Sequence, residues 1–370
     1  MWLLNDRCRG HRCQCVHPVL IGRQWFVMLN MAINTHTEPL IEIGGYFGLD
    51  LPNYGDLYPD AIRFQSARAA IRAVLECNGI TRVMMPAYIC ESIIKSAIDA
   101  GVEVETYDLD ELLYPKNLPR VLPDKCVILY VNYFGLCQQN INRLLEVIPS
   151  DRLIIDNSQA LFASHGDVLA TIYSPRKFVG LPDGGLLVAS PLLKITPPVN
   201  EDLGSIERMR YLFIRMAYSA QEGYADFQQA RNSLQDTLPL AMSRLTRRLM
   251  KSIRWDQVSQ RRKENYSVIA EMMDGINDMH WRLGKEQVPL CYPFTLRGYD
   301  MTEIKSEFAA QNIFIATYWP DALPRIKGGS LEAALLKETL FLPIDQRLDE
   351  VQVASVGRLV LKLTSKQLKT

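Results

Sequence analysis

Between residues 63 and 190 the chain alternates helical patterns with short apolar runs, and this alternation limits the possible folds more than any other feature. It predicts an α/β domain with a mainly parallel central sheet, because parallel strands need long crossover connections that are usually helices. One β-α-β unit can be followed through a strand at 83–85, a helix at 91–100 and a strand at 102–107. Other strands are expected at 126–131, 153–155, 170–173 and 185–188, and another helix near 140–147.

The two ends of this domain are expected to differ in role. Ser66 can cap a helix with an apolar face formed by the residues at 67, 70, 71, 74 and 75. Loops at the carboxyl ends of parallel strands build the ligand sites of such domains. We therefore expect the functional residues in those loops.

Three segments are predicted along the chain. Residues 1–40 form a tail, or an over-extended reading frame whose start is Met28 or Met31. Residues 41–251 form a large domain that ends in long helices, since the region 201–274 carries Arg, Gln, Met and Leu at helical spacing. Residues 252–370 form a small α+β domain, with strands at 288–296 and 313–316 and helices at 301–311 and 349–363.

Composition excludes several classes of protein. The 41 basic and 41 acidic residues cancel, so neither nucleic acid nor an anionic membrane surface is an expected partner. No apolar run reaches the roughly 18 residues that a membrane span requires. Near the N-terminus, Arg23 and Gln24 interrupt the apolar run and no small-residue cleavage site follows, so export is not expected. Eight cysteines without a paired framework predict reduced thiols and a soluble, cytoplasmic protein.

The N-terminal segment contains residues of types that bind zinc, namely Cys8, His11, Cys13, Cys15 and His17. Their spacing is too compressed for the usual paired ligands, and a second ligand pair is missing. We expect no metal site there, and the five histidines of the chain suggest no other.

The chemistry is predicted by an aspartate and a lysine at two strand ends. Asp156 ends an apolar run in Ile-Ile-Asp-Asn-Ser-Gln, and Lys177 stands in Ser-Pro-Arg-Lys just after the next strand, before Gly184 and Gly185. Alone, such a lysine is usually a surface charge and such an aspartate a helix cap. Together they offer what pyridoxal 5'-phosphate (PLP) requires: an amine that bonds to the cofactor aldehyde, and a carboxylate that keeps the pyridine nitrogen protonated.

These residues resemble the DegT/StrS family of sugar aminotransferases, which has an Asp-x-x-Gln/His motif and a downstream lysine before a Gly-Gly strand. The likeness covers roughly 41–360 and includes the segments 61–110, 132–135, 318–320 and 342–347. The resemblance implies a fold-type-I PLP-dependent transferase in which Lys177 and Asp156 are catalytic.

The resemblance also implies how the cofactor phosphate is held. Ser66 and Ala67 occupy the place of the family's Ser-Gly-Thr turn, where amides at a helix start bind the phosphate. Arg68 replaces the family's small hydroxyl and adds a positive charge that could meet the cofactor phosphate or a substrate phosphate. Ser174, three residues before Lys177, is placed to contact the same group.

Two further residues are implied at the cofactor ring. Gln159 matches the residue near the phenolic oxygen, with a helix-surface amide as the alternative. Tyr88 is the candidate for stacking on the ring, although a gapless match selects Cys90. The asparagine that the partner subunit usually supplies is not evident, since Thr237 stands near its place.

Read through the resemblance, the protein is a homodimeric aminotransferase. The implied amino donor is glutamate or glutamine, and the acceptor is a nucleotide-linked keto-sugar used in surface-polysaccharide or secondary-metabolite synthesis. Two alternatives stay open: PLP-dependent lyase, dehydratase or racemase chemistry, and a non-catalytic regulatory protein with the same fold. Arg261, Arg262 and Arg347 are interpreted as members of surface salt bridges.

Overall fold

The protein is described by a computed structural model that covers residues 43–77 and 79–367. The predicted tail at 1–40, which includes the cysteine–histidine segment at 8–17, lies outside these residues. The residues from Leu51 onward form one compact unit. Its core is a seven-stranded sheet with the strand order β1-β7-β6-β5-β4-β2-β3.

The sheet is mixed but mostly parallel, as predicted. The strands are β1 (Ile62–Phe64), β2 (Arg82–Pro86), β3 (Glu103–Tyr107), β4 (Cys126–Val131), β5 (Leu153–Asn157), β6 (Ala170–Tyr173) and β7 (Gly185–Ala189). Strands β3, β2, β4, β5 and β6 pair in parallel, whereas β7 runs antiparallel to β6 and β1 antiparallel to β7. The parallel part places the carboxyl ends of β5 and β6 side by side.

Burial explains why the central strands were readable from sequence. Every residue of β4, β5 and β6 is buried, as expected for parallel strands covered on both faces. Helices α1 (Ala67–Leu75), α2 (Glu91–Asp99) and α3 (Gln138–Leu145) make the crossovers. Ser66 caps α1 as predicted, because its hydroxyl accepts the Ala69 N–H at 3.2 Å.

Gly185 is required by the close approach of β7 to the start of α1. A Cβ atom at this position would lie 2.2 Å from the carbonyl carbon of Ser66 and 2.5 Å from the Ala67 nitrogen. No side chain fits such a gap, so the glycine that ends the Gly-Gly pair brings the strand against the helix N-terminus.

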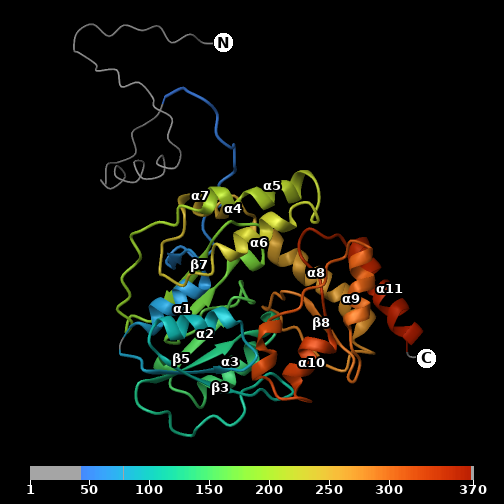
Figure 1. Cartoon of the computed structure of the whole chain (residues 1–370), viewed down its shortest axis with the longest axis horizontal. Coiled ribbons are helices and arrows are strands. Elements are labelled where there is room, and N and C mark those ends of the chain that lie inside the picture. Colours follow the sequence, from blue (N-terminus) through green and yellow to red (C-terminus); the bar gives the residue numbers. More distant parts are fainter. Residues whose placement is uncertain (1–42, 78, 368–370) are drawn as a thin grey trace, which may run out of the picture. The chain divides into compact units, whose positions relative to one another are not determined.

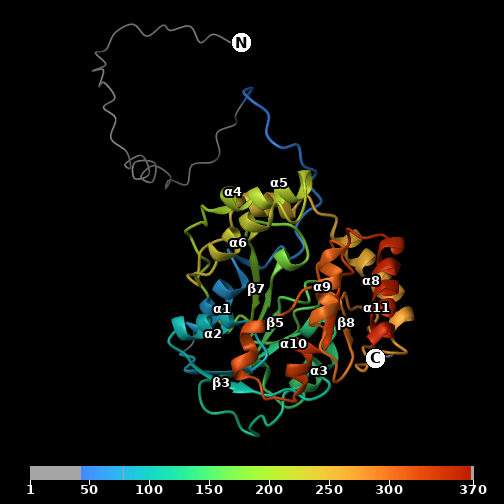
Figure 2. The same cartoon turned by 45° about the vertical axis from the view of Figure 1, so that its right-hand side comes forward.

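The prediction of long helices in the region 201–274 is correct only for its last part. The helices are α4 (Ser205–Arg208), α5 (Arg210–Ala217), α6 (Tyr224–Asn232), α7 (Arg244–Met250) and α8 (Trp255–Met273). Gly204, Gly223 and Ser243 stand at the N-caps of α4, α6 and α7, and they divide the helical spacing into short pieces. In both views α4, α5 and α6 lie together at one end of the unit (Figure 1, Figure 2).

The C-terminal part adds a two-stranded antiparallel sheet and several helices. Its elements are β8 (Tyr292–Thr295), α9 (Thr302–Ala310), α10 (Leu331–Lys337), β9 (Thr339–Leu342) and α11 (Glu350–Gln367). The strand predicted at 313–316 is wrong, since only Ala316 makes an isolated bridge, to Phe341. Helix α8 packs on α11, and Figure 2 shows both beside β8. The domain boundary at 251/252 stays a prediction.

Other sequence predictions can be compared with the described part of the chain. In residues 43–77 and 79–367, no helix is long and apolar enough to cross a bilayer, and no cluster of His, Cys, Asp or Glu could hold a metal. Arg261 and Arg347 form the expected surface ion pairs, with Glu264 and Asp345. Arg262 contradicts that interpretation, because it is buried.

Candidate functional site

The carboxylate of the site lies at the end of β5. Asp156 is 3% exposed, and its Oδ1 accepts the backbone N–H of Ser158 at 2.8 Å. The register of β5 with β6 places Asp156 opposite Ile172, one residue before β6 ends. The chain that leaves β6 therefore starts beside the aspartate.

Lys177 ends the 3₁₀ turn η4 (Pro175–Lys177) that follows β6. Its side chain is accessible to solvent, yet protein crowds it, so that desolvation lowers the pKa of its amine. The Asp156 carboxylate opposes this shift and the Arg68 guanidinium adds to it. Asp156 and Lys177 thus meet electrostatically, although no hydrogen bond joins them in the described structure.

The start of α1 faces this region from the other side of β7. Ser66 makes an isolated bridge to Gly184, and the N–H of Gly184 donates to the Gln65 carbonyl at 2.6 Å. Ala67 and Arg68 open the helix, where N–H groups lack intrahelical acceptors and favour anions. Ser174 precedes the lysine turn and is half-buried.

The positive charges of Arg176, Arg231 and Lys177 collect around Arg68. The pKa of Arg68 is lowered by burial and further by the neighbouring Arg176 and Arg231. In the described ranges, none of these three arginines, nor Lys177, has a carboxylate within ion-pair distance. Cations that are partly desolvated and unpaired favour an anionic ligand. Sequence reasoning missed Arg176 and Arg231; only the adjacency of Arg176 to Lys177 could have suggested the former.

Gln159 supplies a buried donor with no acceptor. Its side chain is fully buried, and its Oε1 accepts the Phe134 N–H at 3.0 Å. Its Nε2 has no hydrogen-bond partner among the described residues. Because buried donors are almost always paired, an unmatched one next to a candidate site marks where a ligand oxygen could bind. The alternative of a helix-surface amide does not fit this burial.

Aromatic residues occupy one flank of the lysine. The Lys177 Nζ lies 5.6 Å from the centre of the Trp319 ring, a contact that sequence reasoning did not assign. Tyr88 is fully buried, stacked on Tyr133 at 5.9 Å and edge-on to Trp319 at 4.9 Å. Its ring offers no accessible face, so its stacking role stays a prediction. Cys90 is half-buried and lies within electrostatic range of both Lys177 and Arg68.

Thr237 serves the protein's own packing. It is fully buried, its hydroxyl donates to the Asp99 carboxylate, and it accepts from Arg72 at 3.1 Å. A residue engaged in this way does not project toward another subunit.

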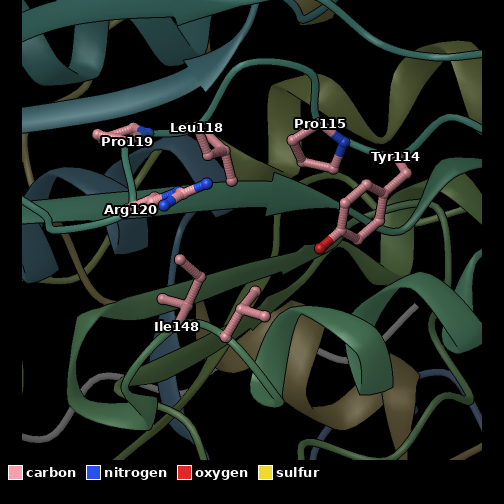
Figure 3. Close-up of a pocket in the computed structure, with 7 residues that line it drawn as sticks. Tyr114, Pro115, Leu118, Pro119, Arg120 and Ile148 are labelled. Carbon is pink, nitrogen blue, oxygen red and sulfur yellow. The ribbon is translucent and has the colours of Figure 1, made fainter.

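A separate hollow of about 500 Å³ shares no residue with this site. It lies between the connection that follows β3 and the end of α3, and Figure 3 shows Leu118 and Arg120 facing Ile148 across it. The Arg143 guanidinium covers the Tyr114 ring at 4.1 Å. The hollow is lined mainly by proline and aliphatic side chains, which suits packing of the surface loop more than catalysis.

Several solved structures share this fold. The provisionally assigned sugar aminotransferase Spr1654 from Streptococcus pneumoniae, in its PLP form, has a TM-score of 0.57 at 17% identity, over 83% of this chain and 88% of that one. DesV from S. venezuelae has a TM-score of 0.53 at 16% identity, over 82% and 84%. A DegT DnrJ EryC1 StrS aminotransferase from Brucella abortus has a TM-score of 0.52 at 16% identity, over 82% and 85%.

Spr1654, and CalS13 from Micromonospora echinospora, which also shares the fold, are described as sugar aminotransferases, and the Brucella protein is described as a DegT DnrJ EryC1 StrS aminotransferase. No family model and no curated protein matches the sequence. The predicted fold is therefore confirmed as that of the fold-type-I PLP-dependent aminotransferases, by structure rather than by sequence similarity.

Proposed function

We propose that this protein is a PLP-dependent aminotransferase in which Lys177 holds the cofactor. The Lys177 amine carries the proposal, because it is accessible, has a lowered pKa and stands beside the strand end that bears Asp156. An amine must lose its proton before it can bond to an aldehyde, so the lowered pKa suits this role. The unmatched donor of Gln159 fits a cofactor oxygen.

The residues divide the work of the reaction. When bound, the cofactor supplies an electron sink for the carbon that bears the substrate amino group. Lys177 Nζ would carry the proton that leaves and returns to the substrate, and the Asp156 carboxylate would keep the cofactor ring nitrogen protonated. Gln159 Nε2, which has no hydrogen-bond partner among the described residues, would donate to the phenolic oxygen of the cofactor.

The cations and the helix start would hold the phosphate. The backbone of Ser66 and Ala67 is placed at the N-terminus of α1, where an anion is favoured. Ser174 would add its hydroxyl. Arg68 would contribute a fixed charge where relatives have a small hydroxyl, which suits the absence of any carboxylate partner.

We propose glutamate or glutamine as the amino donor and a nucleotide-linked keto-sugar as the acceptor. A sugar acceptor is supported by two structural neighbours, Spr1654 and CalS13, which are named sugar aminotransferases. The product would be an amino sugar for surface polysaccharide or a secondary metabolite. Lyase, dehydratase and racemase reactions use the same electron sink, so amino transfer itself has to be measured.

The test combines binding and turnover. PLP added to the purified protein is expected to give the visible band of a lysine-bound cofactor, and glutamate is expected to convert it to the pyridoxamine form. Keto-sugar nucleotides would then be screened for return of the band. A protein saturated with PLP that shows no such band would refute the enzymatic proposal and favour the non-catalytic alternative.

Arg68→Ala is expected to raise the pKa of the Lys177 amine, because a positive neighbour that disfavours the protonated amine is removed. The midpoint for reaction of this amine with the PLP aldehyde should then move to higher pH. Arg72→Ala is the matched control on the same helix, since its guanidinium is paired with Glu76. A midpoint that stays constant or falls in Arg68→Ala would contradict the assignment.

The proposed homodimer has a candidate surface on the helices α4 to α6. The apolar side chains exposed there are Ile206, Phe213, Met216, Tyr218, Tyr224 and Phe227. Helix α5 also contacts the loop that follows Lys177, because the Tyr211 hydroxyl donates to the Leu181 carbonyl at 3.3 Å. An apolar face this extensive beside the candidate site suits a second copy of the chain.

The double variant Ile206→Glu/Met216→Glu is expected to weaken self-association at least about 100-fold, since two exposed apolar side chains that the proposed dimer would bury are replaced by charges. Light scattering coupled to gel filtration measures this effect as a shift from dimer to monomer. Val351→Glu, at an exposed apolar position on α11, is the control and should leave the dimer intact. A wild-type protein that is a fully active monomer would exclude the dimer.

A further inference from the structure

Arg262 is a buried cation whose identified contacts are with neutral groups. It lies on α8, is 2% exposed and shares the buried face with Trp255, Val258, Tyr266 and Ile269. Burial lowers the pKa of its guanidinium to about 10, although the Asp345 carboxylate opposes this shift from a distance. In residues 43–77 and 79–367 it has no carboxylate within ion-pair distance. Such an arginine is costly to bury, so its position calls for an explanation beyond packing.

The guanidinium joins three separate parts of the chain. Its Nη1 donates to the Leu290 carbonyl at 2.9 Å, its Nε to Gln346 Oε1 at 3.1 Å and its Nη2 to the Phe178 carbonyl at 3.3 Å. It also lies 4.6 Å from the centre of the Phe178 ring. The planar guanidinium has several N–H donors in fixed directions and can donate to all these acceptors at once, which the single ammonium group of a lysine cannot do.

The Phe178 carbonyl is held by two donors. Gln346 Nε2 donates to it at 2.8 Å in addition to Arg262. Phe178 directly follows Lys177, and its own N–H closes the turn by donating to the Pro175 carbonyl at 2.9 Å. Both the backbone and the ring of the residue after the lysine are therefore fixed by the C-terminal part of the chain.

The same contacts lead to the second predicted cofactor contact. The Leu290 N–H donates to the Phe134 carbonyl at 2.8 Å, and the Phe134 N–H donates to Gln159 Oε1 at 3.0 Å. A continuous hydrogen-bonded path thus runs from Gln159 through Leu290 and Arg262 to the lysine turn. The Lys177 side chain makes no hydrogen bond to a described residue. The position of its amine therefore depends on the backbone of the turn.

We infer that Arg262, together with Gln346, is a positioning residue that fixes the turn bearing Lys177 relative to Gln159. The inference rests on the proposed function, because it assigns Lys177 to the cofactor. Arg262 itself touches no reacting atom. Its removal should leave the lysine present but its amine less well placed, and displacement of a reacting group by about 1 Å can cost on the order of 100-fold.

The experiment compares Arg262→Gln, Arg262→Lys and Gln346→Ala with wild type, and uses Arg261→Gln as a control because that neighbour is exposed. PLP is titrated, the adduct is reduced with borohydride, and labelled Lys177 is quantified by mass spectrometry across pH. Hydrogen exchange of the peptide 174–181 is measured in the cofactor-free proteins. We expect Arg262→Gln and Gln346→Ala to weaken PLP binding on the order of tenfold or more, to shift the pH midpoint of labelling and to speed exchange in that peptide. Arg262→Lys should not restore wild-type values.

Three outcomes would overturn the inference. If wild type labels at Lys177 and both variants match it in affinity, midpoint and exchange, the inference fails and the proposed function stands. If wild type does not label at Lys177, both fail. If Arg262→Gln does not fold, Gln346→Ala decides the matter alone, since it leaves Arg262 its bonds to the backbone carbonyls of Phe178, Pro289 and Leu290. Wild-type values for that variant would then reject the inference.

Discussion

Lys177→Ala is expected to abolish the visible band of bound PLP and to reduce amino transfer by at least about 10⁴-fold. The variant removes both the amine that bonds to the aldehyde and the group that moves the proton. Loss of an accessible side chain that makes no hydrogen bond to the described residues should leave the fold intact. Absorbance spectra and initial rates with glutamate measure the effect.

Two variants control this experiment. Lys194→Ala removes an exposed lysine and should behave as wild type. Lys177→Arg keeps the positive charge but not an amine that can bond to an aldehyde, so it should be as inactive as Lys177→Ala. Retention of the band and of transfer in Lys177→Ala would mean that another amine holds the cofactor.

Asp156→Asn should lower amino transfer on the order of 100- to 1000-fold while the protein still binds PLP. The amide can keep the hydrogen bond from the Ser158 N–H, so the strand end should remain in place. What is lost is the negative charge that favours a proton on the pyridine nitrogen. The same loss should lower the pKa of Lys177 further, because Asp156 now raises it.

Rates measured with glutamate, together with the pH dependence of the visible band, give both quantities. Asp167→Asn, at an exposed loop position, is the matched control and should change neither. If Asp156→Asn transferred amino groups at the wild-type rate, the carboxylate would have no part in the reaction. A residue other than Asp156 would then have to interact with the pyridine nitrogen of the cofactor that Lys177 holds.

Prediction from the sequence was most accurate for strands that are buried on both faces. The bounds of β4 and β6 agree with the predicted 126–131 and 170–173, because both strands are short apolar runs buried on both faces. Strands β1 and β9 were missed, because β1 has only three residues and β9 begins two residues after α10 ends at Lys337, so neither stands out as a separate apolar run. In the region 201–254 the helical spacing was real, but the caps at Gly204, Gly223 and Ser243 cut it into four helices.

The local sequence also could not show that Arg262 differs from its neighbours in burial. A run of Gln-Arg-Arg-Lys on a polar helix is typical of a solvated face. Arg261 lies on such a face and forms an ion pair with Glu264. Arg262 falls on the buried stripe with Trp255, Tyr266 and Ile269. Its acceptors come from positions 178, 290 and 346, so no local pattern could reveal them.

The sequence by itself determined the fold class, since the alternation of apolar runs and helical patterns fixes local structure and the order of strand ends. It also singled out Asp156, Gln159 and Lys177, because they stand next to those runs. Only the tertiary structure decided the surroundings that give them chemistry: the desolvation of the Lys177 amine, the unpaired arginines and the unmatched Gln159 donor. The physical reason is that burial and electrostatic fields depend on atoms brought together from distant parts of the chain, whereas strand and helix periods depend on near neighbours.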